Sequence, residues 1–432
     1  MNTQSLSWYQ EIREVAFTQD ATHRLWQIAY FSALMIPFML VGHRTAADVL
    51  CGLIGFLFII RSASKKDWAW VRDPLMITLF IAWGWLCVVV TPLAHDVQAS
   101  ASIAFPWIRF LLFFAAMRHW VLVDAKPIKM LGACLSVLLI AIAVDTIWQY
   151  VHGVSLSNHY AADSGRLTGP FNNVKVGIYL ARMLLPVLGI CLFFSLMESR
   201  VRMVLLTYGM LYFFILGTIA VTGERAPFGM SVLGMLTVLG ALALMEKNLR
   251  AQSLALVAVM CGIVYLMVTT QDWVYGRLLH AAEILMDFRN SSYGQLFWMA
   301  YEMGKDNLIT GVGMKNFRLI CEQFIASGLA NHHNLHPHNP YLEWFSEAGL
   351  PGLMLFIGFV GLVLRECITS VIGNAGRYRM IAIFALGSVV VLLFPFVPTQ
   401  SFFANWPAIL FWYALSVALA SLSLCQPKKH FS

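Results

Sequence analysis

Charge is scarce in this chain. Asp, Glu, Lys and Arg together make up 12% of its 432 residues, whereas hydrophobic residues make up 59%, and the mean hydropathy is +0.71. Because a soluble domain carries about 25% charged residues, this composition excludes an ordinary soluble protein and predicts a polytopic membrane protein. The eight cysteines show no CxxC spacing, which argues against a disulfide framework. The phosphate-binding loop of ATPases, Gly-x-x-x-x-Gly-Lys followed by Ser or Thr, is also missing.

Long apolar runs, by contrast, are abundant. A membrane-spanning helix needs about 20 apolar residues, and twelve runs approach or exceed that length: 25–42, 45–60, 73–94, 100–117, 130–151, 174–196, 203–222, 228–246, 252–269, 341–364, 378–398 and 404–425. We therefore predict an all-α, polytopic integral membrane protein with about 12 transmembrane helices. One long polar interval, 270–339, separates spans nine and ten. Its aromatic and aliphatic residues recur at helical spacing, which predicts two or three helices lying on the membrane surface.

The basic residues predict the orientation of these spans. Eighteen of the 29 Lys and Arg residues fall in the connections on one side and nine in those on the other, while Arg109 and Arg182 lie inside apolar runs. Because positive residues are retained in the cytoplasm, the richer side is predicted to be cytoplasmic. The resulting segments are a cytoplasmic tail, nine spans, an extracytoplasmic loop, three further spans and a second cytoplasmic tail, at 1–24, 25–269, 270–339, 340–425 and 426–432.

Four outward connections carry polar groups that apolar helices do not need: 166–175, 222–227, 277–292 and 332–340. The first three contain arginine, although positive residues are usually retained on the cytoplasmic side. The guanidinium is a planar fork of donors suited to phosphate, so a cationic rim at this edge would suit a lipid-linked phosphate. The alternatives are anchoring to lipid head groups and plain ion pairs with carboxylates.

Three charged residues lie inside predicted spans: Arg109, Asp145 and Arg182. At a rise of about 1.5 Å per residue, all three are expected roughly 9–14 Å below the outer surface. A charge at this depth needs a partner or a watery cavity and is a functional candidate. A structural Arg–Asp pair is an equally open interpretation, and a transporter or flippase would use the three as a substrate path.

The densest polar cluster is a histidine motif, because four of the twelve histidines fall at positions 332, 333, 336 and 338. Asn339 and Pro340 predict a helix start, with Asn as the N-cap and Pro at the first helical position. The partial positive charge at that helix end disfavours imidazolium, so His338 should stay neutral, as a general base requires. A zinc site is the rival interpretation, although the histidines lack i, i+4 spacing. Histidines merely solvated at the bilayer edge are a third interpretation.

Several of these segments resemble one known family. The run 336–342 (HPHNPYL), followed by 347–352 (EAGLPG), resembles the signature of the O-antigen ligase family, within the O-antigen ligase and polymerase superfamily. Three further pieces agree with the family's Arg-x-x-Gly-x-x-x-Asn loop, Thr-x-Ser-Arg hairpin and Gly-x-Gly-x-x-x-Phe element: 166–173 (RLTGPFNN), 222–225 (TGER) and 310–317 (TGVGMKNF). The twelve-span layout matches over the full chain.

The resemblance implies a glycosyltransferase whose active site faces the periplasm at a Gram-negative inner membrane. It would transfer a polysaccharide, the O antigen, from undecaprenyl pyrophosphate to a sugar hydroxyl of lipid A–core in lipopolysaccharide biosynthesis. No cofactor, metal or ATP is expected, because the pyrophosphate linkage already carries the driving energy, and no nucleic acid is expected as a partner. One direct displacement would invert the anomeric carbon.

Roles for individual side chains follow from that reaction. His338 is expected to deprotonate the acceptor hydroxyl, while Arg225 and Arg289 stabilise charge on the departing pyrophosphate as preorganised donors. The residues expected to bind substrate are Arg166, Asn172, Lys175, Arg182, Arg277, His336 and Asn339.

Two positions depart from the family pattern. Glu224 replaces the usual Ser before Arg225, and Gly294 stands four residues before Trp298, where many members have Arg. Arg289 is the candidate substitute for that missing charge. An O-antigen polymerase or a protein O-oligosaccharyltransferase of the same superfamily is the alternative function. A transporter is the alternative from another class, and it leaves the histidine motif unexplained.

Overall fold

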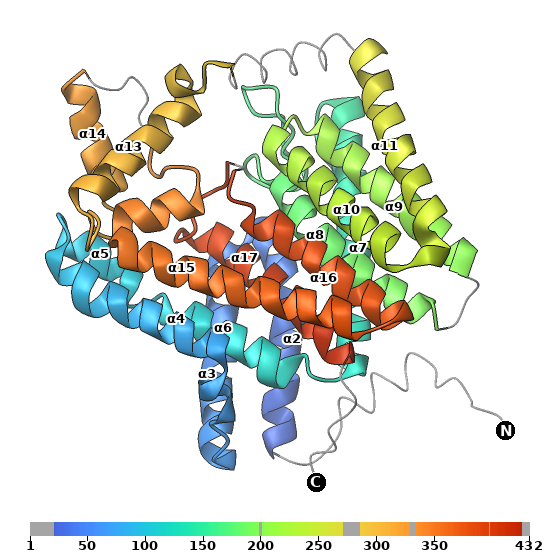
Figure 1. Cartoon of the computed structure of the whole chain (residues 1–432), viewed down its shortest axis with the longest axis horizontal. Helices are drawn as coiled ribbons and strands as arrows, with labels where there is room; N and C mark the ends of the chain where they lie inside the picture. Colours follow the sequence, from blue (N-terminus) through green and yellow to red (C-terminus); the bar gives the residue numbers. More distant parts are fainter. Residues whose placement is uncertain (1–20, 198–200, 271–285, 329–333, 397, 426–432) are drawn as a thin grey trace.

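The computed structural model describes residues 21–197, 201–270, 286–328, 334–396 and 398–425. This part of the chain is helical and contains no strand, apart from one isolated bridge between Val154 and Tyr160. Its α-helices and shorter 3-10 or π-helical turns (Figure 1) are α2 (Ala21–Gly42), α3 (Arg44–Lys65), η1 (Ala69–Arg72), α4 (Pro74–Trp85), η2 (Leu86–Val90), η3 (Thr91–Leu93), α5 (Val97–Ala104), α6 (Ile108–Ala116), η4 (Met117–Val121), α7 (Ala125–His152), α8 (Val176–Ser195), α9 (Val201–Val221), α10 (Arg225–Met245), η5 (Lys247–Leu249), α11 (Arg250–Thr270), η6 (Phe288–Asn290), α13 (Ser292–Asp306), α14 (Phe317–Ala326), α15 (Pro340–Gly373), α16 (Gly376–Leu393), α17 (Asn405–Ala420) and η7 (Ser421–Cys425).

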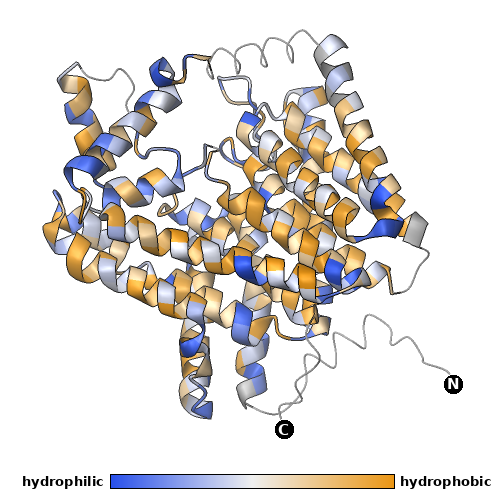
Figure 2. Ribbon diagram, in the orientation of Figure 1, coloured by the Kyte–Doolittle hydropathy of each residue, from blue (hydrophilic) through white to orange (hydrophobic). Residues whose placement is uncertain are grey.

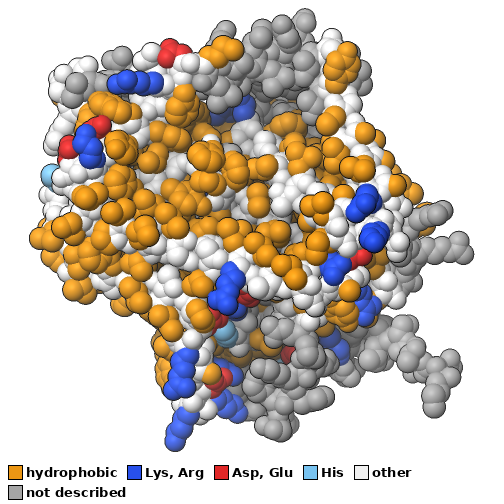
Figure 3. Space-filling view, viewed as in Figure 1, with side chains coloured by type: hydrophobic (Ala, Val, Ile, Leu, Met, Phe, Trp, Pro, Cys, Tyr) orange, Lys and Arg blue, Asp and Glu red, His pale blue; other side chains and the backbone are white. Residues whose placement is uncertain are grey.

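Eleven helices among the described residues are long and apolar enough to cross a membrane. They confirm the predicted all-α, polytopic membrane class, and apolar side chains are accordingly spread across the middle of the face shown in Figure 3. The shortest predicted run, 45–60, lies within the 22-residue helix α3. The predicted run 252–269 lies within α11, which is 21 residues long and is not among the eleven.

Successive long helices alternate in direction, so their ends collect in two layers. In one layer, here called the α13 end, α2, α7, α9 and α16 end and α3, α8, α10, α15 and α17 begin. The helices η6, α13 and α14 lie beyond this layer, away from the start of α2 (Figure 1). They are the helices predicted for the polar interval, and Figure 2 shows their more mixed hydropathy. They share a small core of their own, which includes Leu296, Met303, Phe317 and Cys321.

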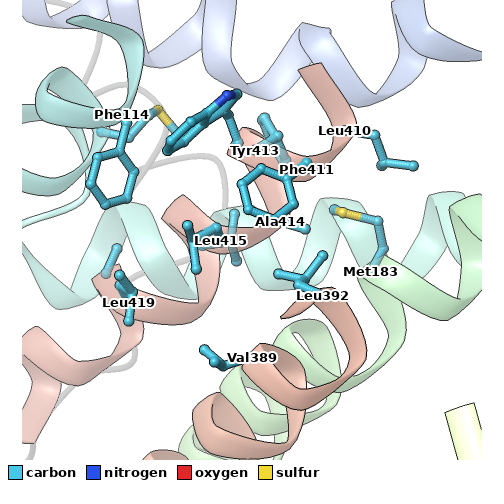
Figure 4. Packing of buried hydrophobic residues seen from close by; sticks show 14 of the residues in the cluster. Phe114, Met183, Val389, Leu392, Leu410, Phe411, Tyr413, Ala414, Leu415 and Leu419 are labelled. Carbon is cyan, nitrogen blue, oxygen red and sulfur yellow. The ribbon is translucent and has the colours of Figure 1, made fainter. Parts of the chain in front are cut away.

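Two helices form the buried centre of the bundle. All residues of α17 from Ala408 to Ala420 are buried, and α8 is buried along almost its whole length. Figure 4 shows Tyr413 and its neighbours on α17 packed near Met183 of α8 and Leu392 of α16. Because these central helices contact protein rather than lipid, a polar side chain on them can lie inside the protein. Arg182 on α8 is such a side chain.

Two tyrosine hydroxyls bond both central helices to α2 around its internal proline. Pro37 has no N–H, so the carbonyl of Ala33, four residues earlier, receives no helical hydrogen bond. The Tyr413 hydroxyl of α17 donates to that carbonyl at 2.9 Å. The Tyr179 hydroxyl of α8 donates to the Pro37 carbonyl, also at 2.9 Å. Both buried hydroxyls are thereby satisfied at the same turn of α2.

A sharp break divides α15 at Gly349. The residue has φ +72° and ψ −174°, a conformation open essentially to glycine alone. A Cβ at this position would lie 2.1 Å from the Ile309 carbonyl oxygen. The break frees the Leu350 N–H, which donates instead to the Leu308 carbonyl at 2.7 Å. The predicted run 341–364 therefore consists of a short first helix and a long second one.

The family-like segments 310–317 and 347–352 form one structural unit around this break. The Val312 N–H donates to the Ser346 carbonyl at 2.8 Å, and the Gly313 N–H donates to the Glu347 carbonyl at 3.1 Å. These bonds tie the connection between α13 and α14 to the short first part of α15. That part begins directly after the histidine motif, so the unit fixes where the motif lies.

Replacing Gly349 with alanine should destabilise the protein. Backbone strain alone costs about 1–3 kcal/mol, and the added Cβ would collide with Ile309. The measurement is thermal unfolding of detergent-purified protein, together with the monodisperse fraction. Gly358→Ala on the same helix is the matched control, because a Cβ there meets nothing within 4 Å. Equal stability of the two variants would contradict the assigned break.

Candidate active site

The histidine arm, defined here as residues 334–340, is fixed by a helix cap. Asn339 Oδ1 accepts hydrogen bonds from the Tyr341 and Leu342 N–H groups at 3.0 and 3.1 Å, and Pro340 is the first residue of α15. The predicted helix start is therefore confirmed. Asn339 Nδ2 donates to the Pro395 carbonyl at 2.6 Å. Because this buried side chain is engaged within the protein through both its atoms, we leave Asn339, which we expected to bind substrate, out of the proposed site.

His338 is bonded in both directions to the loop between α16 and α17. Its backbone is left-handed, with φ +57°, which is uncommon for residues other than glycine. The Thr399 N–H donates to the His338 carbonyl at 2.6 Å, and His338 Nδ1 lies 3.2 Å from the Thr399 carbonyl oxygen. A carbonyl only accepts, so Nδ1 carries the proton and Nε2 is the basic nitrogen. Nε2 lies 2.8 Å from Nδ2 of Asn334, which donates to it.

Burial keeps both described histidines of the arm neutral. It lowers the pKa of His338 below the ordinary value of 6.5. Burial, assisted by the neighbouring His338, lowers the pKa of His336 to about 3, and the two ring centroids lie 4.2 Å apart. The Tyr293 ring of α13 packs edge-on against His338 at 5.7 Å. A neutral imidazole with an oriented Nε2 is able to accept a proton.

One residue of the predicted site, Arg277, lies outside the described part of the chain. So do His332 and His333 of the histidine motif. Among the residues that are described, no three His, Cys, Asp or Glu side chains form a group that could hold a metal ion. His336 Nε2 is buried and has no hydrogen-bond partner within the same set.

A second polar group gathers at the N-terminus of α8. A backbone hydrogen bond of 3.1 Å joins the 166–175 loop to the 222–225 hairpin. Glu224 Oε1 accepts from the Gly177 N–H at 2.6 Å, within the first turn of α8. Burial raises the pKa of Glu224, and the bonds from the α8 backbone act against that rise. The residue that departs from the family's Ser therefore caps α8 and anchors the hairpin that carries Arg225.

Two arginines of this group are exposed and unpaired. Neither Arg166 nor Arg225 makes a side-chain hydrogen bond or ion pair to any residue for which the structure gives a position. Asn172, in the same loop as Arg166, is also exposed. These side chains are free to contact a ligand.

Lys175 connects this group to α17. Its Nζ lies 4.9 Å from the centroid of the Trp406 ring, in cation–π geometry. Burial, and then the nearby positive charge of Arg44, lower the pKa of Lys175. Lys175, directly before α8, and Arg44, the first residue of α3, are thus two cations from different connections that lie close together.

Arg182 lies beside the histidine arm, on α8 seven positions after Lys175. It is 6% exposed, and its guanidinium donates to the Pro407 carbonyl at 3.1 Å. It lines a cavity of about 10 Å³ together with Thr399 and Gln400, close to the volume that holds a single water. Gln400 Oε1 is buried without a partner in the described structure. Because Thr399 also bonds His338, the structure brings Arg182 next to the arm.

The other two charges of the predicted spans have their own partners. Arg109 Nε donates to Asp48 at 2.7 Å, and its guanidinium also donates to Asn405 at 2.5 Å. Asp145 accepts from the Leu156 N–H at 2.5 Å. A structural Arg–Asp pair therefore exists, with Asp48 as the partner of Arg109. The three charges have separate partners, so within the described residues they form no continuous charged path.

The turn before α13 explains the missing family arginine. A Cβ at Gly294 would lie 1.6 Å from the Phe288 carbonyl oxygen, so no side chain fits at that position. Arg289 lies in the same turn and is exposed, with no ion pair to the described residues. It precedes by four positions Tyr293, whose ring contacts His338. Arg289 therefore stays the candidate for the charge that is missing at Gly294.

The sequence reasoning missed the loop that holds the arm. Thr399 and Ser401 come from the connection between α16 and α17, where the polar run 399–401 separates two apolar spans and is the only signal that the sequence carries. Glu343, buried on the first turn of α15, accepts from the Ser401 hydroxyl at 2.5 Å and from the Phe402 N–H at 2.7 Å. These bonds hold the loop where Thr399 meets His338.

The fold and this site define a multi-pass helical membrane protein with a neutral, oriented histidine and unpaired arginines at one end of its bundle. Residues 187–357 match the family model described as O-Antigen ligase. This match confirms the resemblance to the O-antigen ligase family found in the sequence. It includes Arg225, Arg289 and His338, whereas Arg166 and Lys175 precede it. No curated protein matches the chain.

Burial of the two imidazoles sets an order of titration. In histidine-labelled protein, His338 should titrate with a midpoint below 6.5, and His336 should stay neutral down to about 3 or until unfolding. The folded-state pKa values lie below the unfolded ones, so the unfolded chain takes up protons first and stability falls as pH drops below 6.5.

Nuclear magnetic resonance checks this order, with the two rings assigned from His338→Gln and His336→Gln and with denatured protein as the reference. A His338 midpoint at or above that of the denatured chain would show a solvated ring and contradict the structure.

Proposed function

We propose that this protein is an O-antigen ligase. It transfers a polysaccharide from undecaprenyl pyrophosphate to a sugar hydroxyl of lipid A–core, at the periplasmic face of the Gram-negative inner membrane, with both termini in the cytoplasm. The match to the O-Antigen ligase model supports glycosyl transfer of this general kind. The multi-pass helical fold supports a donor and an acceptor that are both membrane lipids.

The observation that carries the proposal is a set of exposed arginines that form no ion pair with a carboxylate. Arg166, Arg225 and Arg289 lie on the side poor in positive charge, where topology gives no reason for them, and none forms an ion pair with a carboxylate of the described residues. The nearest to such a pair is Arg166, whose charge acts against the burial-driven rise in the pKa of Glu224 without an ion-pair contact. Arg109 on the same side shows the structural alternative, because it pairs with Asp48 at 2.7 Å. An unpaired guanidinium keeps its fork of donors for an external anion, and pyrophosphate fits that fork.

His338 is the proposed general base. The acceptor hydroxyl takes the place of the Asn334 amide at Nε2 and gives its proton to that nitrogen. Its oxygen then attacks the anomeric carbon of the donor sugar. The bond from that carbon to the pyrophosphate oxygen breaks, and undecaprenyl pyrophosphate leaves with the electron pair. The Thr399 carbonyl, bonded to Nδ1, keeps the ring oriented and favours the imidazolium that forms.

The arginines, together with Lys175, are proposed to hold the leaving pyrophosphate. Arg225 and Arg289 supply donors as negative charge develops on it, and such preorganised donors act most strongly where water is excluded. Arg166 and Lys175 are proposed to contact the same pyrophosphate. Arg182, deeper and next to the arm, is proposed to contact the donor near the reacting carbon.

An O-antigen polymerase would use the same donor but extend another lipid-linked glycan. The two reactions differ only in the acceptor, so incubation of the purified protein with donor alone and with donor plus lipid A–core separates them. Longer glycans from donor alone would assign polymerase activity. Product that forms only with lipid A–core supports the ligase.

His338→Ala should lower the transfer rate by about 10²–10⁴-fold, because it removes the base. Its abundance in the membrane should be unchanged, since the two groups that bond its ring, the Asn334 amide and the Thr399 backbone carbonyl, lie in loops and not in a spanning helix. His152→Ala, at the exposed end of α7, is the control and should transfer normally. Full activity of His338→Ala would end the general-base assignment. Loss of wild-type activity on chelation, restored by zinc, would favour the metal interpretation instead.

Arg225→Lys should lose transfer about 10–100-fold, because a hydrogen bond to a charged group is worth about 1.5–3 kcal/mol and Lys lacks the bidentate fork. Folding should be normal, as Arg225 has no side-chain partner in the described structure. Arg365→Lys, an exposed arginine near the opposite end, is the matched control. Initial rates at saturating acceptor measure the effect. Equal rates for wild type and Arg225→Lys would reduce Arg225 to a general electrostatic role.

A further inference from the structure

Three helices leave an apolar groove beside the arginine hairpin. It has a volume of about 380 Å³, within the range of roughly 300–1,000 Å³ typical of small-molecule sites. None of its lining residues is charged. Those used below come from α9, α10 and α11 and are Gly217, Ala220, Phe228, Leu236, Cys261 and Tyr265.

The groove begins at the level of Arg225. On α9 it includes Ala220, one residue before the helix ends, and on α10 it includes Phe228, three residues after Arg225. Leu236 lies eleven residues beyond Arg225 on the same helix, which at 1.5 Å per residue is roughly 16 Å further along the axis. The groove therefore runs from the cationic hairpin into the apolar part of the bundle.

Small side chains and the position of α11 create this space. A Cβ at Gly217 would meet nothing within 4 Å, so that face of α9 is open. α11 packs mainly against α10, and Figure 1 shows it as the outermost helix beside α9 and α10. The wall formed by α11 reaches the surface of the protein, because Cys261 and Tyr265 are exposed there.

We propose that this groove binds the polyprenyl chain of the lipid-linked donor, an inference that rests on the proposed function. A molecule with a pyrophosphate head and a long apolar tail needs a cationic site continuous with an apolar path, and this is the arrangement at Arg225. Lipid tails around the protein are as apolar as the groove, so occupancy supplies little bulk affinity. Its effect is positional: the bound tail directs the pyrophosphate toward the hairpin.

Protection of Cys261 from alkylation tests the occupant without any glycan transfer. Full-length protein in lipid nanodiscs is treated with a maleimide, and modification at this exposed thiol is measured by mass spectrometry, with Cys261→Ser as the blank. Undecaprenyl pyrophosphate should slow the modification severalfold. Farnesyl pyrophosphate, which has the same head and a short tail, should slow it less. Equal protection by phosphatidylglycerol, or none by undecaprenyl pyrophosphate, would overturn the proposal.

Gly217→Leu should place its side chain in the groove, because a Cβ at this position meets nothing within 4 Å. It should abolish the protection of Cys261 and raise KM for the undecaprenyl-linked donor roughly tenfold or more, while turnover with a short-chain donor stays unchanged. Gly240→Leu on α10, also open but outside the groove, is the matched control. If undecaprenyl pyrophosphate protects Cys261 but the protein transfers no glycan, the proposed lipid site stands and the proposed ligase function falls. If Gly217→Leu transfers glycan normally although Cys261 is no longer protected, the proposed lipid site falls and the proposed ligase function stands.

Discussion

Two hydrogen bonds between His338 and Thr399 hold the site together. One joins the backbones of the arm and of the α16–α17 loop, and the other fixes the tautomer of the imidazole. Each contributes only about 0.5–1.5 kcal/mol on its own, so the geometry needs support from both sides. The Asn339 cap anchors the arm, and Glu343 anchors the loop. With these in place, Nε2 is the nitrogen left to face a substrate.

The distribution of charge follows from the apolar bundle around it. In a membrane protein a buried charge must be paired or must face a cavity, because lipid offers no partner. Arg109 meets this demand through Asp48. Arg182 meets it only in part, with one backbone carbonyl and a small cavity beside the arm. The exposed Arg166 and Arg225 have no such demand and stay available. An ion pair with a carboxylate thus distinguishes an arginine that stabilises the fold from the arginines proposed to bind substrate.

Local sequence determined what could be predicted. The spans followed from apolar length, and the start of α15 followed from the N-cap chemistry of Asn339 and Pro340, because both signals lie within a few residues. The break at Gly349 was not foreseen, since it goes with packing against a distant segment: the Leu350 N–H donates to the Leu308 carbonyl, and only glycine fits beside the Ile309 carbonyl, forty positions earlier. Thr399 was missed for the same reason: its partner is 61 positions away. Long-range pairing in a helical bundle leaves no trace in local periodicity.

The anomeric configuration of the new glycosidic bond tests the central claim most directly. A neutral base at His338, facing a leaving group held by arginines, performs one displacement and needs no covalent intermediate. Resonances of the anomeric proton and carbon in donor and product give the configuration. The account expects inversion between the undecaprenyl-linked donor and the lipid A–core product. Retention would require a nucleophile and two displacements, and it would contradict the role assigned to His338.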